Sequence, residues 1–195
     1  MRSTKKVIQL TIVQKYLILL LGALNFKPLR GKTWLQKEMF LLSRNIENLR
    51  DEIYFEPHHY GPYSELLDQE LENLEILGIV ELNDKIKLTD VGRKVYTHLV
   101  SKLSPDELEL VREIRSELDD LTEEELLALI YFSYPKMTKE SRVLDRILKN
   151  REKIAVKLYL KEKVSLAKAA EIAGKGLSEF IRYLKKQGTK IPLSY

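Results

Sequence analysis

The stretch LEILGIVELNDKIKLTDVG, residues 74–92, limits most strongly how this chain can fold. Two runs of β-forming residues, 79–82 and 85–88, flank an Asn-Asp pair that favours a tight turn. Gly78, before the first run, is typical of a helix C-terminus, and Thr89, after the second run, is a good helix N-cap. The sequence therefore predicts a short hairpin between two helices.

Helical spacing of apolar residues dominates the rest of the first hundred residues. It predicts further helices, two of them with Thr33 and Ser64 as N-caps, over 8–24, 34–49, 65–77 and 90–103. Three helices, a two-stranded wing and a fourth helix are the order of a winged helix-turn-helix domain, which we predict for residues 1–103.

An acidic helical section is predicted over residues 104–149. Ser104-Pro105 is a typical helix start, and Thr122 and Ser141 are candidate N-caps for helices over 123–132 and 142–150. Residues 104–127 contain 10 acidic and 2 basic side chains, whereas residues 142–195 contain 14 basic and 5 acidic ones. A polyanionic partner is therefore expected to meet the C-terminal quarter of the chain.

A basic helix-turn-helix is predicted over residues 150–195. Its helices cover 152–160, 166–173 and 177–187, with Ser165 as a cap and a turn at Gly174-Lys175-Gly176. A helix-turn-helix needs a small residue where its two helices cross and a flexible residue in the turn four positions later. Ala170 and Gly174 have that spacing. The expected buried stripe of the last helix consists of Leu177, Phe180, Ile181 and Leu184. The whole chain is thus predicted to be mainly α.

The last of these helices is the candidate DNA-reading element. Ser178, Arg182 and Lys185 lie at i, i+4 and i+7, and Arg182 could reach a base edge in the major groove. Lys168, Lys175 and Lys186 are expected to contact phosphates. The alternative is a small helical bundle that uses the same Ala and Gly only for packing.

The C-terminal sequence VSLAKAAEIAGKGLSEFIRYLKKQG resembles the uncharacterised protein family 0175, small prokaryotic proteins regarded as antitoxins. The resemblance rests on Leu158-Tyr159, Val164-Ser165-Leu166, Lys168-Ala169-Ala170-Glu171, Ala173-Gly174, Phe180 and Leu184. The family has an apolar residue directly after the Ala-Gly pair, where this chain has Lys175 and Gly176. The resemblance implies toxin neutralisation or autoregulation.

The N-terminal region is similar to Panacea-type (SocA-like) antitoxin domains. The similarity rests on Trp34-Leu35-Gln36-Lys37, on Tyr60-Gly61-Pro62-Tyr63-Ser64 and on the wing that follows. However, the third predicted helix, 65–77, contains five acidic residues and no Lys or Arg, so phosphates would repel it. We therefore expect this domain to bind a protein or to dimerise, and residues 150–195 to contact DNA.

The segment from Phe55 to Ser64 is a second candidate site. It contains His58, His59, Tyr60, Gly61, Pro62 and Tyr63. Adjacent His residues suggest a metal, but consecutive residues of an extended loop point in different directions and chelate poorly, so no metal is predicted. Two roles stay open: a turn that aims the next helix, and an exposed surface for docking a partner.

Other functional classes find little support. The chain has no Cys, only three His and no phosphate-binding Gly-rich loop, and no spacing joins its polar residues into a catalytic set. We expect no enzyme activity and no cofactor. The basic start and the apolar residues 16–26 mimic a signal peptide, but polar residues interrupt the longer stretch and favour a buried helix. A cytoplasmic protein without membrane association is expected.

The function that the sequence favours is that of a DNA-binding regulator, the antitoxin of a toxin–antitoxin pair. Its partners would be double-stranded DNA, a protein toxin and a second copy in a homodimer, since helix-turn-helix proteins usually bind two half-sites. The alternatives are a transcriptional regulator without a toxin and a protein–protein adaptor that does not bind DNA.

Overall fold

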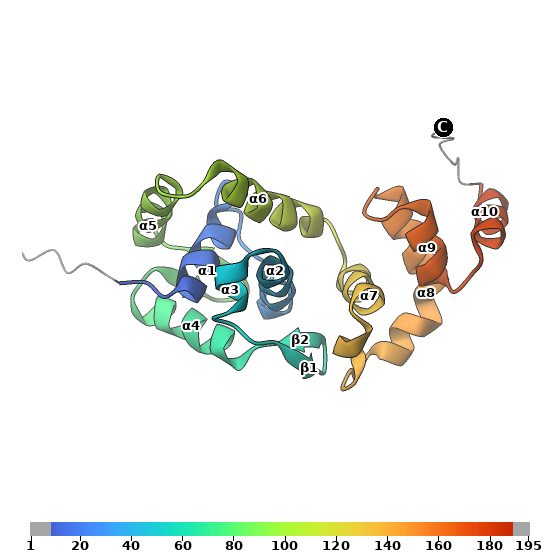
Figure 1. The fold of residues 1–195 in the computed structure, drawn as a ribbon, viewed down its shortest axis with the longest axis horizontal. Coiled ribbons are helices and arrows are strands. Elements are labelled where there is room, and N and C mark those ends of the chain that lie inside the picture. Colours follow the sequence, from blue (N-terminus) through green and yellow to red (C-terminus); the bar gives the residue numbers. More distant parts are fainter. Residues whose placement is uncertain (1–8, 189–195) are drawn as a thin grey trace, which may run out of the picture. The chain divides into compact units, whose positions relative to one another are not determined.

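The structure, a computed structural model, describes residues 9–188 and is mainly helical over that range (Figure 1). The described residues form ten α-helices, one 3₁₀ helix and two two-stranded β-sheets. The prediction of a mainly α protein with a small hairpin is confirmed. No helix among residues 9–188 has both the length and the apolar character needed to cross a membrane.

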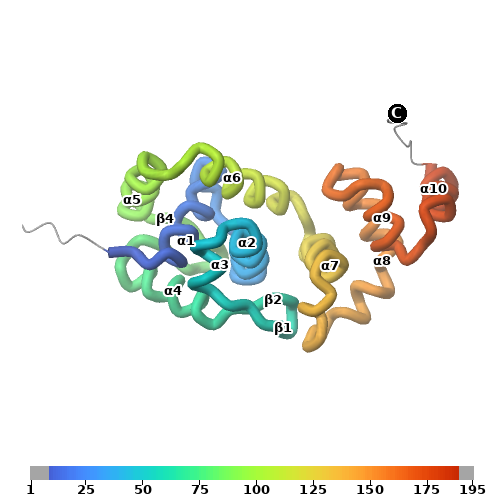
Figure 2. The backbone as a smooth tube through the Cα atoms, viewed as in Figure 1, coloured from blue at the N-terminus to red at the C-terminus, as the bar shows by residue number. Residues whose placement is uncertain are grey.

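The chain packs as two units. The first comprises the described residues of Met1–Phe55 and Tyr63–Leu118, and the second those of Glu56–Pro62 and Asp119–Tyr195. The course of the backbone through both units can be followed in Figure 2. The three domains predicted over 1–103, 104–149 and 150–195 stay a prediction, because packing does not show which segments fold independently.

Helix α1 (Ile12–Gly22) is the core of the first unit. Its side chains from Tyr16 to Leu20 are fully buried. The helix packs against helices α3 (Glu47–Arg50), α4 (Glu65–Ile76) and α5 (Asp90–Val100) and against strand β4 (Ile86–Leu88). Thr11 and Gln14 form a reciprocal capping box that fixes its start. The predicted buried helix is confirmed with shorter bounds, and the basic residues 1–8 lie outside the described residues.

The single helix predicted over 34–49 is two helices, α2 (Lys32–Asn45) and α3 (Glu47–Arg50). The prediction of Thr33 as N-cap is wrong, because the N-cap is Gly31, whose φ of 151° favours glycine. Ile46 separates the helices with an extended backbone (φ −119°, ψ 111°), and both Ile46 and Leu49 are buried.

Two short strands, β1 (Glu56–His58) and β2 (Gly61–Tyr63), occupy the segment that was predicted to be non-helical. Helix α4 (Glu65–Ile76) follows, and Gly78 lies just beyond its end at a φ of 67°. Ser64 is the N-cap residue of α4 as predicted, but its side chain makes no capping hydrogen bond.

The predicted hairpin is present as β3 (Val80–Leu82) and β4 (Ile86–Leu88). The strands are antiparallel, with Val80 opposite Leu88. Thr89 caps α5 (Asp90–Val100) by accepting a hydrogen bond from the N–H of Gly92. Gly92 must be small, because a Cβ there would lie 2.1 Å from the carbonyl oxygen of Ile79.

Helix α6 (Pro105–Asp119) begins as predicted, with the side chain of Ser104 accepting from the N–H of Glu107. Its Arg115 is buried and forms an ion pair with Glu38 of α2 at 3.6 Å. Removing one partner of a buried ion pair is in general strongly destabilising, because the other charge stays desolvated.

The second unit contains α7 (Glu123–Ser133), the 3₁₀ helix η1 (Pro135–Thr138), α8 (Leu144–Leu160), α9 (Leu166–Ala173) and α10 (Leu177–Lys186). The helices predicted over 142–150 and 152–160 are one continuous helix, so the predicted interruption between these two helices is wrong. Ser141 is not an N-cap, since α8 starts after Val143. The side chain of Ser141 instead contacts the hydroxyl of Tyr131 at 2.8 Å.

Candidate nucleic-acid interface

Helices α9 and α10 and the turn between them form the candidate interface. Ser165 caps α9 by accepting from the N–H of Lys168 at 3.2 Å. Gly174 ends this helix in the left-handed conformation (φ 70°), where glycine has no steric penalty. The N–H of Lys175 then bonds to the carbonyl of Ala170 at 3.0 Å. The predicted bounds of α9 and the position of the turn are confirmed.

Arg151 of α8 holds the end of α9. Its Nε donates to the carbonyl of Ile172 at 2.6 Å and its Nη2 to that of Glu171 at 3.0 Å. The guanidinium also lies 5.0 Å from the centre of the Phe132 ring. A cation at a helix C-terminus donates hydrogen bonds to the free carbonyls and interacts favourably with the negative end of the helix dipole. Sequence reasoning missed this contact, because its partners come from three helices.

The buried side of α10 differs in part from the predicted stripe. Phe180 and Leu184 are fully buried, and Ile181 is partly exposed. Leu177, predicted to be buried, is 47% exposed, because it is the first residue of the helix and adjoins the turn.

The residues predicted to contact DNA from α10 lie on its exposed side. Ser178, Arg182 and Lys185 are all exposed, and Lys186 is exposed beside them. Their spacing of i, i+4 and i+7 places the first three on one side of the helix. Within residues 9–188, Arg182, Lys185 and Lys186 form no ion pair, so their charges face solvent.

Lys168 and Lys175, the other predicted phosphate contacts, are engaged within the protein. Lys175 forms ion pairs with Glu152 at 2.9 Å and with Glu179 at 3.0 Å, and its side chain is only 17% exposed. The hydrogen bonds to Glu152 and then Glu179 raise its pKa. Lys168 donates to the carbonyl of Phe132 and pairs with Glu171, both at 2.8 Å. Both lysines therefore have partners within the protein, unlike Arg182, Lys185 and Lys186 of α10.

Acidic residues at the start of α7 neutralise part of the basic charge of α8 and the loop after it. Arg146 pairs with Glu123 and Glu124 at 3.3 Å each, and Lys161 pairs with the buried Glu125 at 2.8 Å. Lys163 pairs with Asp120 at 3.2 Å. Cations that stay exposed without an acidic partner in the described part of the unit include Lys149, Lys153, Lys157, Arg182, Lys185 and Lys186.

The loop residues from His58 to Tyr63 are distributed over several environments. Gly61 and Pro62 are buried, whereas Tyr60 is exposed. The rings of His58 and His59 lie 4.2 Å apart. Burial, and then the neighbouring charges of Arg142 and His58, lower the pKa of His59. No group of three potential metal ligands occurs within residues 9–188.

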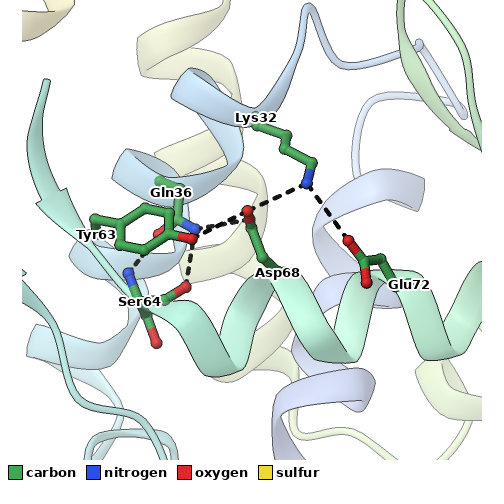
Figure 3. A network of polar contacts seen from close by, with 6 residues as sticks. All are labelled: Lys32, Gln36, Tyr63, Ser64, Asp68 and Glu72. Atoms are coloured by element: carbon green, nitrogen blue, oxygen red, sulfur yellow. Dashed lines mark hydrogen bonds and ion pairs between the residues drawn. The ribbon is translucent and has the colours of Figure 1, made fainter. Parts of the chain in front are cut away.

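A polar network in the first unit anchors the N-terminus of α4 to α2 (Figure 3). The amide of Gln36 accepts from the N–H of Ser64 at 2.9 Å and donates to the carbonyl of Ser64 and to Asp68 at 3.0 Å each. Lys32 pairs with Asp68 at 3.1 Å, and the hydroxyl of Tyr63 donates to the same carboxylate. Burial, followed by the charge of Asp68, raises the pKa of Tyr63.

The outer side of α4 is acidic and apolar. Glu65 and Glu72 are exposed, and so are Leu66, Ile76 and Leu77 at or near its end; Ile76 is 83% exposed. The helix contains no Lys or Arg. This surface would repel phosphates.

Comparison with known families concerns the C-terminal part of the chain. Residues 135–195 match the model of Uncharacterised protein family (UPF0175), and the match begins in η1 and includes α8, α9 and α10. No curated protein matches the chain. The N-terminal similarity to Panacea-type domains stays a prediction, since residues before 135 lie outside the family match. The C-terminal third of the chain is thus similar to family UPF0175, as its sequence predicted.

Proposed function

We propose that this protein is a DNA-binding regulator that contacts duplex DNA through the exposed face of α10, and that it serves as the antitoxin of a toxin–antitoxin pair. The observation that supports this most directly is the set of exposed cations on α10: Arg182, Lys185 and Lys186 have no acidic partner within residues 9–188, whereas Lys168 of α9 and Lys175 of the turn are paired. The antitoxin role rests on the resemblance of residues 135–195 to their family.

The arrangement of α9, its turn and α10 supports insertion of α10 into a major groove. In a helix-turn-helix the second helix carries the base-contacting side chains, and Arg182 has the length and donor geometry to contact a guanine. Lys185 and Lys186, in the last turn of α10, would contact phosphates and fix the register. Lys175 would contact a phosphate as well only if that phosphate displaces Glu152 and Glu179 from its ammonium group.

In this proposal the first unit is a winged-helix domain that binds protein. The proposal takes α1, α2 and α4, the β3–β4 hairpin and α5 as the elements of a winged helix-turn-helix, with α3 and the β1–β2 hairpin inserted before α4. At the position of the recognition helix, α4 lacks basic residues. Lys87 of the wing is paired with Glu81 at 3.0 Å. We assign toxin binding or dimerisation to this unit, in a non-enzymatic protein of the cytoplasm.

A binding titration tests the DNA contact. The full chain is titrated against a fluorescent 20-base-pair duplex of random sequence, and anisotropy is followed at several salt concentrations. Arg182→Ala with Lys185→Ala should weaken binding at least tenfold and reduce the salt slope by about 2, because each lost phosphate contact lowers the slope by about one.

The matched control, Lys136→Ala with Lys139→Ala, removes one exposed lysine of η1 and the exposed lysine that follows η1. It removes the same net charge and should leave the affinity within about twofold of the wild type. Equal losses in both double variants would contradict the assignment to α10. An adaptor that does not bind DNA would show little binding and no salt slope in the wild type. A regulator without a toxin is distinguished by the neighbouring genes and by purification from the native host, in which an antitoxin retains its toxin.

A further inference from the structure

Helix α8 carries a row of lysines on the side that faces solvent. Lys149, Lys153 and Lys157 are all exposed and follow one another at intervals of four residues. Residues four apart in an α-helix lie on one side of it, with a rise of about 6 Å between them. We call these three residues the lysine row. The buried residues of α8, which pack against the rest of the unit, are Ile147, Ile154, Ala155 and Leu158.

Neighbouring acids do not compensate the charges of the lysine row. None of its three side chains forms an ion pair within residues 9–188, whereas Arg146 of the same helix pairs with Glu123 and Glu124. Like charges four residues apart on a helix repel each other, so the row contains two unfavourable pairs. The arrangement slightly disfavours the helix, and an anionic partner would relieve the repulsion.

A series of neighbouring side chains connects the lysine row with the exposed face of α10. Lys149 and Glu152 are three residues apart on α8 and are therefore neighbours on its surface. Glu152 pairs with Lys175 of the turn at 2.9 Å, and Lys175 pairs with Glu179 of α10 at 3.0 Å. Glu179 in turn lies three residues before Arg182. A polyanion bound at Arg182 therefore comes close to the row within the second unit.

The chemistry of the lysine row fits a nucleic-acid backbone better than it fits a protein. The centres of protein–protein interfaces are depleted in lysine, whereas lysines bind phosphates as point charges and release counterions. Leu160 is 57% exposed, but it lies beyond the last lysine, and Val156 is only partly exposed. The row therefore lacks the apolar centre that a protein interface needs.

We propose that the lysine row of α8 is a second DNA-contacting surface, which binds phosphates of the same duplex whose groove receives α10. This inference rests on the proposed function, because a duplex at α10 is the polyanion that comes close to the row. Contacts to phosphates carry no sequence information, so the row raises the affinity and its salt dependence. Arg182 supplies the base contact, and α8 holds the unit on the backbone.

A neutral variant of the row measures its contribution. Lys149→Gln with Lys153→Gln and Lys157→Gln removes three charges and keeps good helix formers. In the anisotropy titration with the 20-base-pair duplex, affinity at low salt should fall at least tenfold, and the salt slope should decrease by about 2–3. Urea unfolding should show that this variant is at least as stable as the wild type, because the repulsion within the row is gone.

The matched control also loses three exposed lysines. Lys94→Gln with Lys136→Gln and Lys139→Gln removes the same net charge at positions outside α8 and α10, and it should leave the affinity within about threefold of the wild type. An unchanged affinity of the row variant, or equal losses in the row variant and the control, would overturn the inference.

Chemical modification of the lysines shows where the duplex lies. The full chain is acetylated with an N-hydroxysuccinimide ester, with and without the 20-base-pair duplex, and the modified lysines are identified by mass spectrometry. The duplex should protect the lysine row together with Lys185 and Lys186. Lys136 and Lys139 should stay as reactive as in the free protein.

The pattern of protection separates this inference from the proposed function. Protection of Lys185 and Lys186 without the lysine row would overturn the inference and leave the contact through α10 intact. Protection of the row without Lys185 and Lys186 would contradict the contact through α10, and with it the shared duplex. Equal protection of Lys136 and Lys139 would show that no particular surface contacts the duplex, and would overturn both.

Discussion

The guanidinium of Arg151 occupies the space that a side chain at Gly174 would need. A Cβ built at Gly174 would lie 2.7 Å from Cζ of Arg151, while the same guanidinium bonds to the carbonyls of Ile172 and Glu171. Glycine is therefore needed at position 174 for two reasons. The backbone at the end of α9 is left-handed, and the guanidinium that caps this helix lies where a side chain would be.

Gly174→Ala should destabilise the region of α9 and α10 by about 1–3 kcal/mol, since it combines left-handed strain with displacement of Arg151. Hydrogen–deuterium exchange of the amides in these helices measures the local change. Gly176→Ala is the matched control, because Gly176 has a φ of −64° and nothing within 4 Å of an added Cβ. Equal losses of protection in both variants would contradict the role of Arg151.

Gln36 should be the most sensitive polar position of the first unit. Gln36→Ala removes three hydrogen bonds at a buried site and leaves the backbone of Ser64 without its partner, at a cost of about 2–3 kcal/mol. Urea unfolding followed by the fluorescence of Trp34, the single Trp of the chain, reports on this unit. Gln69→Ala, at an exposed glutamine of α4, should change stability by less than about 0.5 kcal/mol. A similar cost for the two variants would argue against the network.

The sequence alone was sufficient to predict where helices begin when an N-cap residue marks the start. Thr89, Thr122 and Ser165 cap helices as predicted, and each accepts a hydrogen bond from the backbone N–H three residues later. The two main errors have local causes as well. The helices predicted over 142–150 and 152–160 are a single helix, since no Gly or Pro interrupts α8. The break at Ile46 has no sequence signal and arises from packing.

At the candidate site, the sequence predicted only those features that follow from the positions of residues along a single helix. The common side of Ser178, Arg182 and Lys185 follows from the period of α10, and these residues are exposed as expected. The pairing of Lys175 with Glu152 depends on how α8 lies beside the turn, which sequence spacing does not reveal. The same holds for Lys168, whose acceptor is a carbonyl of α7.

Glu125 should make the second unit sensitive to acid. Burial alone would raise the pKa of its carboxyl, but hydrogen bonds from Lys161 and from the N–H of Thr122 outweigh burial and lower the pKa below its ordinary value. A pKa that is lower in the folded state means that ionised Glu125 stabilises the fold above its unfolded pKa. This contribution is lost as the pH falls through the folded pKa.

Glu125→Gln keeps an oxygen for the Thr122 cap and removes the charge, so it should cost about 1 kcal/mol at pH 7, whereas Glu125→Ala loses both and should cost about 2 kcal/mol. Urea unfolding followed by circular dichroism at pH 7 and pH 3 measures both costs. The cost of Glu125→Gln should be smaller at pH 3 than at pH 7, because protonation removes the charge of the wild-type carboxyl progressively as the pH falls. A cost that is the same at both pH values would show that the charge of Glu125 is irrelevant.

Glu179 is expected to weaken DNA binding in two ways, and its neutralisation should strengthen it. Glu179 adds a negative charge to α10 and, with Glu152, holds the ammonium of Lys175. Glu179→Gln should increase affinity for duplex DNA about three- to tenfold at low salt, because it removes a negative charge from α10 and leaves Lys175 paired with Glu152. Adding Glu152→Gln should also make the salt slope steeper by about 1, because Lys175 is then able to neutralise a phosphate, and Lys175→Ala in that background should remove the added slope. Glu113→Gln, which neutralises an exposed acid of α6, separates this local effect from the change in net charge and should raise affinity much less. Equal gains from Glu179→Gln and Glu113→Gln would show that only net charge matters and that α10 does not approach the DNA.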